Sequence, residues 1–186
     1  VRNAVDPAIF RRPSVAERAA ARTALGLDGP AILFFGRDPE LKGADTLAAA
    51  LAIFRGATVV TVATPERANA QLGEVARVIA LERADDVRTL MWACDVLAVP
   101  SRGEGASLVL LEALACGTPV AASDLPALRE SAAGSEMAFF APAGDGAALA
   151  RALAVAVAAP CEPEPAAPRS PERWADDVLA LYGSPR

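Results

Sequence analysis

The stretch that decides the fold runs from Cys94 to Asp124 and reads CDVLAVPSRGEGASLVLLEALACGTPVAASD. Its short apolar run Val96–Val99 is typical of a buried strand, and the loop that follows carries Glu104. That loop leads into an apolar helix whose only charged residue is Glu112, and a Cys-Gly-Thr break separates this helix from a second strand. The stretch therefore predicts a strand, helix and strand unit with one carboxylate before the helix and another in its middle.

The spacing of the two carboxylates predicts a ligand site. Seven residues separate Glu104 from Glu112, which places one just before the helix and the other about two turns into it. Both can face one crevice at the carboxyl end of a strand, where open α/β sheets bind ligands. A carboxylate in an apolar helix loses hydration unless something binds it. The plainer alternative for Glu112 is a structural carboxylate that accepts hydrogen bonds from a neighbouring loop.

A second polar turn follows an earlier strand. Only one of the 18 basic residues is a lysine, Lys42, and it lies with Arg37 directly after the apolar run Ala31–Phe35. A guanidinium can fork onto two oxygens, and an ammonium supplies a compact point charge. Two cations at a strand-to-helix turn suit a diphosphate. The alternative for Arg37 is a surface ion pair with Asp38 or Glu40.

Strand and helix patterns alternate along the chain, which predicts an α/β fold with a parallel sheet covered on both faces. With right-handed crossovers this gives a doubly wound, Rossmann-like sheet of about six strands. The expected strands are Ala31–Phe35, Thr58–Val62, Val75–Ala80, Val96–Val99, Pro119–Ala122 and Met137–Phe140. The expected helices are Val15–Leu25, Ala44–Phe54, Pro65–Leu72, Asp85–Ala93, Ser107–Ala115, Pro126–Ala132, Gly146–Ala158 and Pro171–Leu181.

The same pattern divides the chain into four parts. Residues 1–13 are expected to be the tail of an interdomain linker, and residues 14–159 the α/β domain. Residues 160–170 are rich in proline and are expected to form a stiff, extended linker. Residues 171–186 carry the last helix, with Trp174 and Tyr182 on its apolar side. That helix is equally suited to pack on its own domain or on another.

Composition excludes several classes of function. A net charge of −5 and a pI near 4.8 argue against a nucleic-acid surface. No uncharged run approaches the ~18 residues that span a bilayer, and no signal peptide is evident. The three cysteines have no metal or redox spacing, and the absence of histidine excludes Ser-His and Cys-His chemistry. The expected location is the cytoplasm, with any peripheral membrane contact made through a missing domain.

Together these segments resemble the C-terminal half of a group 1 (family 4) glycosyltransferase, a retaining enzyme with two Rossmann-like domains (the GT-B fold). Residues 3–6, Asn-Ala-Val-Asp, resemble the interdomain segment of that family. Residues 36–45 resemble its Gly-Arg…Lys-Gly-x-Asp turn, and residues 100–120 resemble its Glu-x7-Glu signature. The chain departs from the family at Ala4, where a glycine is usual, and at Ala106-Ser107, which leaves donor identity open.

The resemblance implies a nucleoside-diphosphate sugar as the donor, with no metal and no cofactor. It assigns Glu112 to the ribose hydroxyls and Glu104 to a hydroxyl of the transferred sugar. Arg37 and Lys42 would hold the diphosphate, so that Arg37, Lys42 and Glu104 are the expected catalytic residues. Helix-start amides of Gly105–Leu108 would add donors, although Ser107 is also a plausible helix cap. The full set of expected donor-binding residues is Gly36, Arg37, Lys42, Glu104, Gly105, Ala106, Ser107, Leu108 and Glu112.

The acceptor is expected to bind a missing N-terminal domain, so that this chain alone binds donor without transferring sugar. Two alternatives remain open, a non-catalytic module that binds nucleotide sugars and half of a GT-B nucleotide-sugar epimerase. A nicotinamide oxidoreductase is disfavoured because no G-x-G-x-x-G follows the first strand, and a phosphate-loop nucleotidase because G-x-x-x-x-G-K-[ST] is absent.

Overall fold

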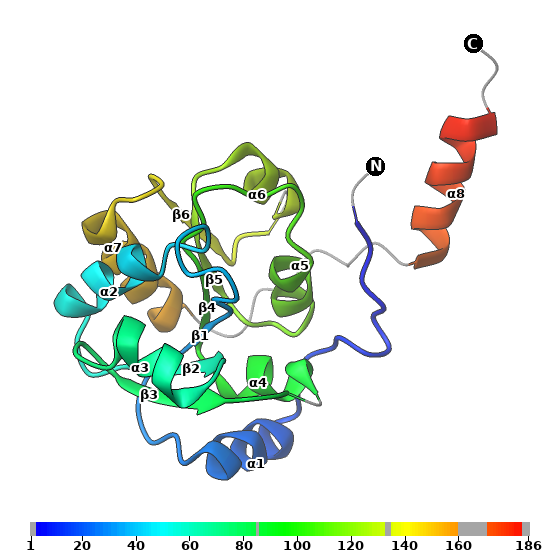
Figure 1. Ribbon diagram of the computed structural model, residues 1–186. Coiled ribbons are helices and arrows are strands. Elements are labelled where there is room, and N and C mark those ends of the chain that lie inside the picture. The colour runs from blue at the N-terminus through cyan, green and yellow to red at the C-terminus, as the bar shows by residue number, and fades with distance from the viewer. Residues whose placement is uncertain (1–2, 85, 133–134, 160–170, 184–186) are drawn as a thin grey trace.

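One parallel sheet organises the computed structural model, which describes residues 3–84, 86–132, 135–159 and 171–183 (Figure 1). The sheet has six strands in the order β3-β2-β1-β4-β5-β6. The strands are β1 (Ala31–Phe34), β2 (Thr58–Val62), β3 (Arg77–Leu81), β4 (Val96–Val99), β5 (Val120–Ser123) and β6 (Ala138–Ala141). This is the strand order of a Rossmann fold, so the prediction of a doubly wound sheet is confirmed.

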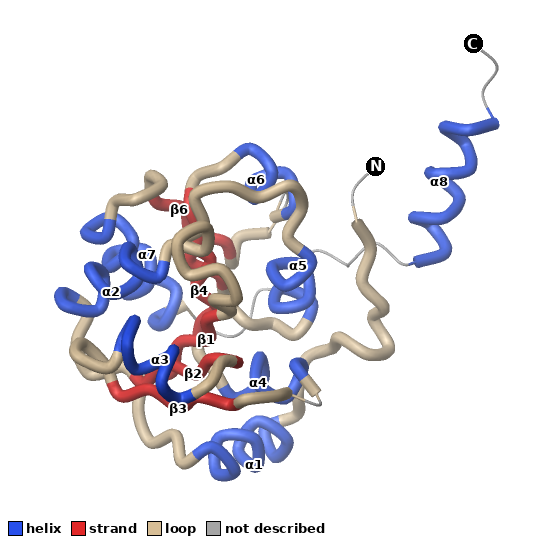
Figure 2. The backbone as a smooth tube through the Cα atoms, viewed as in Figure 1, coloured by secondary structure: helices blue, strands red, loops and turns tan. Residues whose placement is uncertain are grey.

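Helices cover both faces of the sheet, with the sheet edge-on between them (Figure 2). On one face α2, α3 and α7 pack on a core that includes Ile32 and Phe34. On the other face α4, α5 and α6 pack on a core that includes Leu33, and α1 packs against α4. Neighbouring residues of β1 thus enter opposite cores, as strand geometry requires. The helices are α1 (Val15–Leu25), α2 (Ala44–Ile53), α3 (Pro65–Leu72), α4 (Val87–Ala93), α5 (Leu108–Ala115), α6 (Pro126–Ser131), α7 (Gly146–Ala158) and α8 (Pro171–Gly183).

The observed bounds differ from the predicted ones by at most two residues, and local hydrogen bonds explain two of the differences. Strand β3 begins at Arg77 rather than Val75, because the amides of Val75 and Ala76 both donate back to the carbonyl oxygen of Leu72 at the end of α3. Helix α4 begins after Asp86, whose carboxylate accepts from the amide of Arg88. The predicted start of that helix, residue 85, lies outside the described residues.

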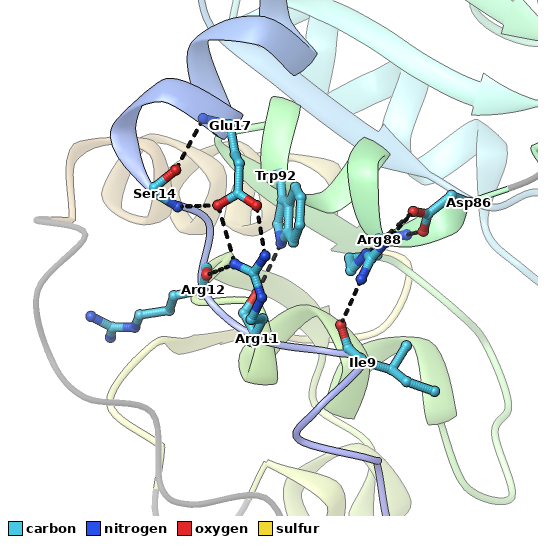
Figure 3. Close-up of polar contacts among 8 residues, drawn as sticks. All are labelled: Ile9, Arg11, Arg12, Ser14, Glu17, Asp86, Arg88 and Trp92. Atoms are coloured by element: carbon cyan, nitrogen blue, oxygen red, sulfur yellow. Dashed lines mark hydrogen bonds and ion pairs between the residues drawn. The ribbon is translucent and has the colours of Figure 1, made fainter.

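The segment before α1 lies against α4 (Figure 3). The indole Nε1 of Trp92 donates to the carbonyl oxygen of Arg11 at 2.8 Å. The guanidinium carbons of Arg11 and Arg88 lie 5.0 and 4.9 Å from the centroid of the same ring. These cation–π contacts and the hydrogen bond hold the predicted linker tail to the domain.

The start of α1 is fixed by its own side chains. Ser14 and Glu17 form a capping box, in which the Ser14 hydroxyl accepts from the Glu17 amide and the Glu17 carboxylate accepts from the Ser14 amide (Figure 3). Arg11 donates to both oxygens of the same carboxylate at 2.6 and 3.1 Å. These bonds lower the pKa of Glu17 to about 2, with the Arg11 hydrogen bond as the largest cause.

Helix α8 stands apart from the sheet domain in Figure 1. Leu179 of this helix is 67% exposed. The proline-rich segment 160–170 lies outside the described residues, as do the side chains of Trp174 and Tyr182. Within the described residues, no helix is long and apolar enough to cross a membrane.

Candidate functional site

The candidate site lies where the strand order reverses, between β1 and β4. The chain leaves the carboxyl ends of these two neighbouring strands in opposite directions, one into α2 and the other into α5. Doubly wound sheets bind ligands in the crevice at this switch point. The two loops concerned, residues 35–43 and 100–107, carry most of the residues that the sequence nominated.

The backbones of the two loops touch at Gly43. Its φ of +71° lies in the left-handed region, and a Cβ atom there would stand 2.0 Å from the carbonyl oxygen of Pro100. A residue with a side chain would therefore meet both backbone strain and a direct clash. This close approach brings the residue before Gly43, Lys42, next to the second loop.

Lys42 and Glu104 form an ion pair across the switch point. The Nζ atom of Lys42 lies 2.6 Å from Oε1 of Glu104, and the Ser101 hydroxyl donates to the same oxygen at 2.8 Å. The Glu104 side chain is 10% exposed and the Lys42 side chain 31%. One carboxylate oxygen and two of the three ammonium hydrogens are outside these bonds. A cavity of about 50 Å³, lined by both residues and Ser101, adjoins the pair.

Arg37 is exposed at the edge of this site. Its backbone carbonyl accepts from the Arg67 guanidinium, but its own side chain has no hydrogen bond or ion pair with any residue that the structure describes. The structure therefore contains no surface ion pair between Arg37 and Asp38 or Glu40. The Asp38 carboxylate instead accepts from the Leu41 amide at 3.2 Å.

Glu112 occupies the middle of α5, where it is partly buried. Burial raises the pKa of its carboxyl group, because the ionised form loses hydration. No side-chain hydrogen bond or ion pair satisfies it among the described residues. The structural alternative required such a partner from a neighbouring loop, so the geometry leaves this carboxylate available to a ligand.

The start of α5 presents the helix-end amides that the sequence nominated. Gly105 and Ala106 are exposed, and the helix begins at Leu108. Ser107 is a buried residue at the predicted N-cap position, but its hydroxyl makes no capping hydrogen bond. The first amides of the helix have no intrahelical acceptor and carry its positive partial charge.

The structure adds two residues that sequence reasoning missed, Ser101 and Arg102. Ser101 supports Glu104, and Arg102 bridges to the first loop through Leu41 and Glu40. Their place in the loop before Glu104 was visible in the sequence, but the register between two loops 60 residues apart was not. Among the described residues, no group of three or more side chains suits a metal ion.

The fold and this polar cluster define a Rossmann-like α/β domain with an open site at its switch point. The family model described as glycosyl transferases group 1 matches residues 29–158, so the chain belongs to that family. It is 38% identical to D-inositol 3-phosphate glycosyltransferase of Jonesia denitrificans, in an alignment that covers 74% of this chain and 38% of that protein. The chain thus spans well under half the length of this relative.

Two solved structures share the fold. Sucrose-phosphate synthase of Thermosynechococcus elongatus superposes with a TM-score of 0.76 at 28% identity, covering 96% of this chain and 50% of that one. HepE of Anabaena, crystallised with UDP and glucose, gives a TM-score of 0.77 at 21% identity, covering 98% of this chain and 56% of that one. The predicted family is therefore confirmed, and the domain is one Rossmann-like half of the GT-B fold.

Proposed function

We propose that this chain binds a nucleoside-diphosphate sugar and supplies the donor half of a retaining, metal-independent glycosyltransferase. The observation that carries the proposal is the Lys42–Glu104 pair at the switch point. Its members retain two ammonium hydrogens and one carboxylate oxygen that no group in the described residues uses. Such a pair can hold the phosphate of a donor on one side and a sugar hydroxyl on the other.

The proposed chemistry is departure of the nucleoside diphosphate from the anomeric carbon of the sugar. Negative charge then develops on the β-phosphate oxygens, and Lys42 and Arg37 stabilise it where it forms. The exposed amides at the start of α5 add donors to the same phosphates. In this scheme cationic side chains do the work of a metal ion.

Two carboxylates position the donor along its length. Glu104 accepts a hydrogen bond from a hydroxyl of the transferred sugar at its second oxygen, Oε2. Glu112 accepts from the ribose hydroxyls, and two such bonds would repay the hydration that its ionised form has lost. Fixed contacts at both ends of the diphosphate hold the anomeric carbon in register for attack.

The similar proteins support this assignment. HepE was crystallised with UDP and glucose, and the curated relative is a glycosyltransferase. Because the chain covers 38% of that relative and about half of each similar structure, we propose that the acceptor is held by residues outside this chain. We also propose that the protein acts in the cytoplasm and that it uses no cofactor.

Calorimetric titration with UDP and UMP tests the proposal. We expect UDP to bind more tightly than UMP, and Lys42→Ala to remove most of that preference. Lost charge-assisted hydrogen bonds should cost about 1.5–3 kcal/mol in UDP affinity. GDP and ADP, each with its monophosphate, extend the test to other bases.

Arg55→Ala is the matched control, because Arg55 follows the far end of α2 and its side chain donates to the carbonyl oxygen of Ala52. It removes one positive charge without touching the site. A chain that binds mono- and diphosphates equally for every base, or a Lys42→Ala variant with the wild-type preference, would contradict the proposal.

A further inference from the structure

Arg102 ties together the two loops that form the site. Its amide donates to the carbonyl oxygen of Leu41 at 2.9 Å, and its Nη1 donates to the carbonyl oxygen of Glu40 at 2.6 Å. Its Nη2 is bonded to Oδ2 of Asp45 in the first turn of α2. One residue thus makes three separate bonds to the opposite loop and the helix that follows it.

These bonds surround Lys42 in the sequence. Glu40 and Leu41 directly precede Lys42, and Asp45 follows it by three residues. Arg102 itself stands two residues before Glu104. These three Arg102 bonds, the loop clamp, therefore act on the chain next to both members of the Lys42–Glu104 pair. Among the described residues, Arg102 makes no hydrogen bond or ion pair with either of their side chains.

The energetics favour a geometric role over a stabilising one. The Arg102 and Asp45 side chains are 41% and 66% exposed, and ion pairs this accessible contribute little to folding. A planar guanidinium can, however, fix the direction between two acceptors, which an ammonium cannot do. Here the two acceptors are a loop carbonyl and a helix side chain, so the fork relates the loop to α2.

The surroundings of Arg102 show why such a clamp is needed. Arg102, Glu40 and Asp45 line a cleft of about 610 Å³ that opens beside α3, outside the switch point. Lys42 and Glu104 line the separate small cavity at the switch point. On the cleft side the first loop borders open space, where the Arg102 bonds and the bond from Arg67 to the carbonyl oxygen of Arg37 restrain it.

We propose that Arg102 is a positioning residue that holds Lys42 at the distance from Glu104 required to grip a diphosphate. This inference rests on the proposed function. It predicts that Arg102 contributes to selectivity for a diphosphate over a monophosphate without contacting the nucleotide.

Two measurements on the full chain test the inference, each with Arg102→Ala, Arg102→Lys and the control Arg55→Ala. The first is the ratio of UDP to UMP affinity, by calorimetry. We expect about a tenfold fall in that ratio for both Arg102 variants, because a displaced Lys42 loses its phosphate contact. UMP affinity and the melting temperature should stay close to wild type, and Arg55→Ala should change nothing.

The second measurement is hydrogen–deuterium exchange of the nucleotide-free protein, which does not depend on the proposed function. The amides of Lys42 and Ala44 donate to the carbonyl oxygens of Asp38 and Pro39 within the first loop. Both Arg102 variants should exchange these amides faster than wild type, while the control should not.

The outcomes separate the two proposals. Wild-type exchange in Arg102→Ala overturns the positioning role whatever the nucleotide data show. A wild-type ratio of UDP to UMP affinity in either Arg102 variant also overturns the positioning role. If Arg102→Lys alone keeps the wild-type ratio, the effect of Arg102 is one of long-range charge. If the Arg102 variants exchange faster but the wild-type chain does not prefer UDP to UMP, the loop clamp is retained and the proposed function is rejected.

Discussion

The parallel strands begin at one edge of the sheet, the amino edge, and end at the other, the carboxyl edge. Each edge carries a cluster of cationic side chains and carboxylates, but the clusters differ in how many of their donors and acceptors are hydrogen-bonded. At the amino edge, just before β4, Asp95 accepts from Arg18 at 2.6 Å and from Arg22 at 3.1 Å. Its Oδ2 also accepts from the amide of Ala31, the first residue of β1, at 2.8 Å. Other guanidinium hydrogens of the two arginines reach backbone carbonyl oxygens around the end of α4 and Gly29.

At the carboxyl edge the corresponding groups are only partly used. Glu104 accepts from the Lys42 ammonium and from the Ser101 hydroxyl at one oxygen, Oε1. The side chains of Arg37 and Glu112 have no partner among the described residues. A desolvated acceptor without a partner costs the fold free energy unless a ligand completes it, whereas an exposed guanidinium is hydrated by water. This difference favours a stabilising role for the amino-edge cluster and supports our proposal that the carboxyl-edge cluster binds a ligand.

The largest expected effect is on stability, at the amino edge. Asp95→Ala removes the acceptor shared by two arginines and a strand amide, and should lower the free energy of unfolding by about 3 kcal/mol. In a domain of this size that corresponds to a fall of roughly 6–12 °C in the melting temperature. UDP affinity, measured well below the melting temperature, should not change. A loss of affinity without a loss of stability would reverse the assignment of the two edges.

A smaller effect is expected on binding, at the carboxyl edge. Arg37→Ala should weaken UDP binding about tenfold, because one charge-assisted hydrogen bond is lost. The melting temperature of the nucleotide-free protein should not change, since the Arg37 side chain has no partner to lose in the part of the chain that the structure describes. Arg151→Ala is the charge-matched control, because Arg151 is an exposed arginine on α7. Equal weakening by both variants would show that net charge, rather than the site, attracts the nucleotide.

The smallest effect has an unusual sign. Because burial raises the pKa of Glu112 in the folded protein, its stabilising contribution is complete below the unfolded pKa and is lost as pH rises through the folded pKa. At pH 7, Glu112→Gln should therefore raise the free energy of unfolding, by less than about 1 kcal/mol once solvent screening is allowed for.

Thermal melts between pH 4 and 7 give the check on Glu112. The advantage of Glu112→Gln should shrink as pH falls, while its UDP affinity at pH 7 should be lower than that of wild type. A variant that is less stable at pH 7 and binds UDP normally would restore the structural alternative for this residue.

The sequence was sufficient for the fold because buried strands and amphipathic helices follow from local patterns. Continuous apolar runs such as Val96–Val99 located the strands, and capping residues located α1 and its first turn. Errors arose where hydrogen bonds between neighbouring elements set the boundary, as when Val75 bonds back to α3 instead of entering β3. Such choices depend on three-dimensional context that a local pattern does not contain.

The sequence could nominate residues for the candidate site, but it could not predict their contacts. The unique lysine and the isolated Glu112 were visible as departures from composition and pattern. The direct bond from Lys42 to Glu104 was not, because it depends on the approach of Gly43 to Pro100. The role of Arg102 was hidden for the same reason, since both of its partner segments lie some 60 residues earlier in the chain.

The most direct test of the central claim is to locate the bound nucleotide by nuclear magnetic resonance. Backbone amide shifts of the chain are compared without and with UDP, with UMP as the reference for the diphosphate. We predict that the largest UDP-specific changes fall in residues 36–43 and 104–112, and that the amides of Arg18, Arg22 and Asp95 stay unchanged. Changes concentrated at the amino edge, or none specific to UDP, would contradict the assignment of the open polar cluster to diphosphate binding.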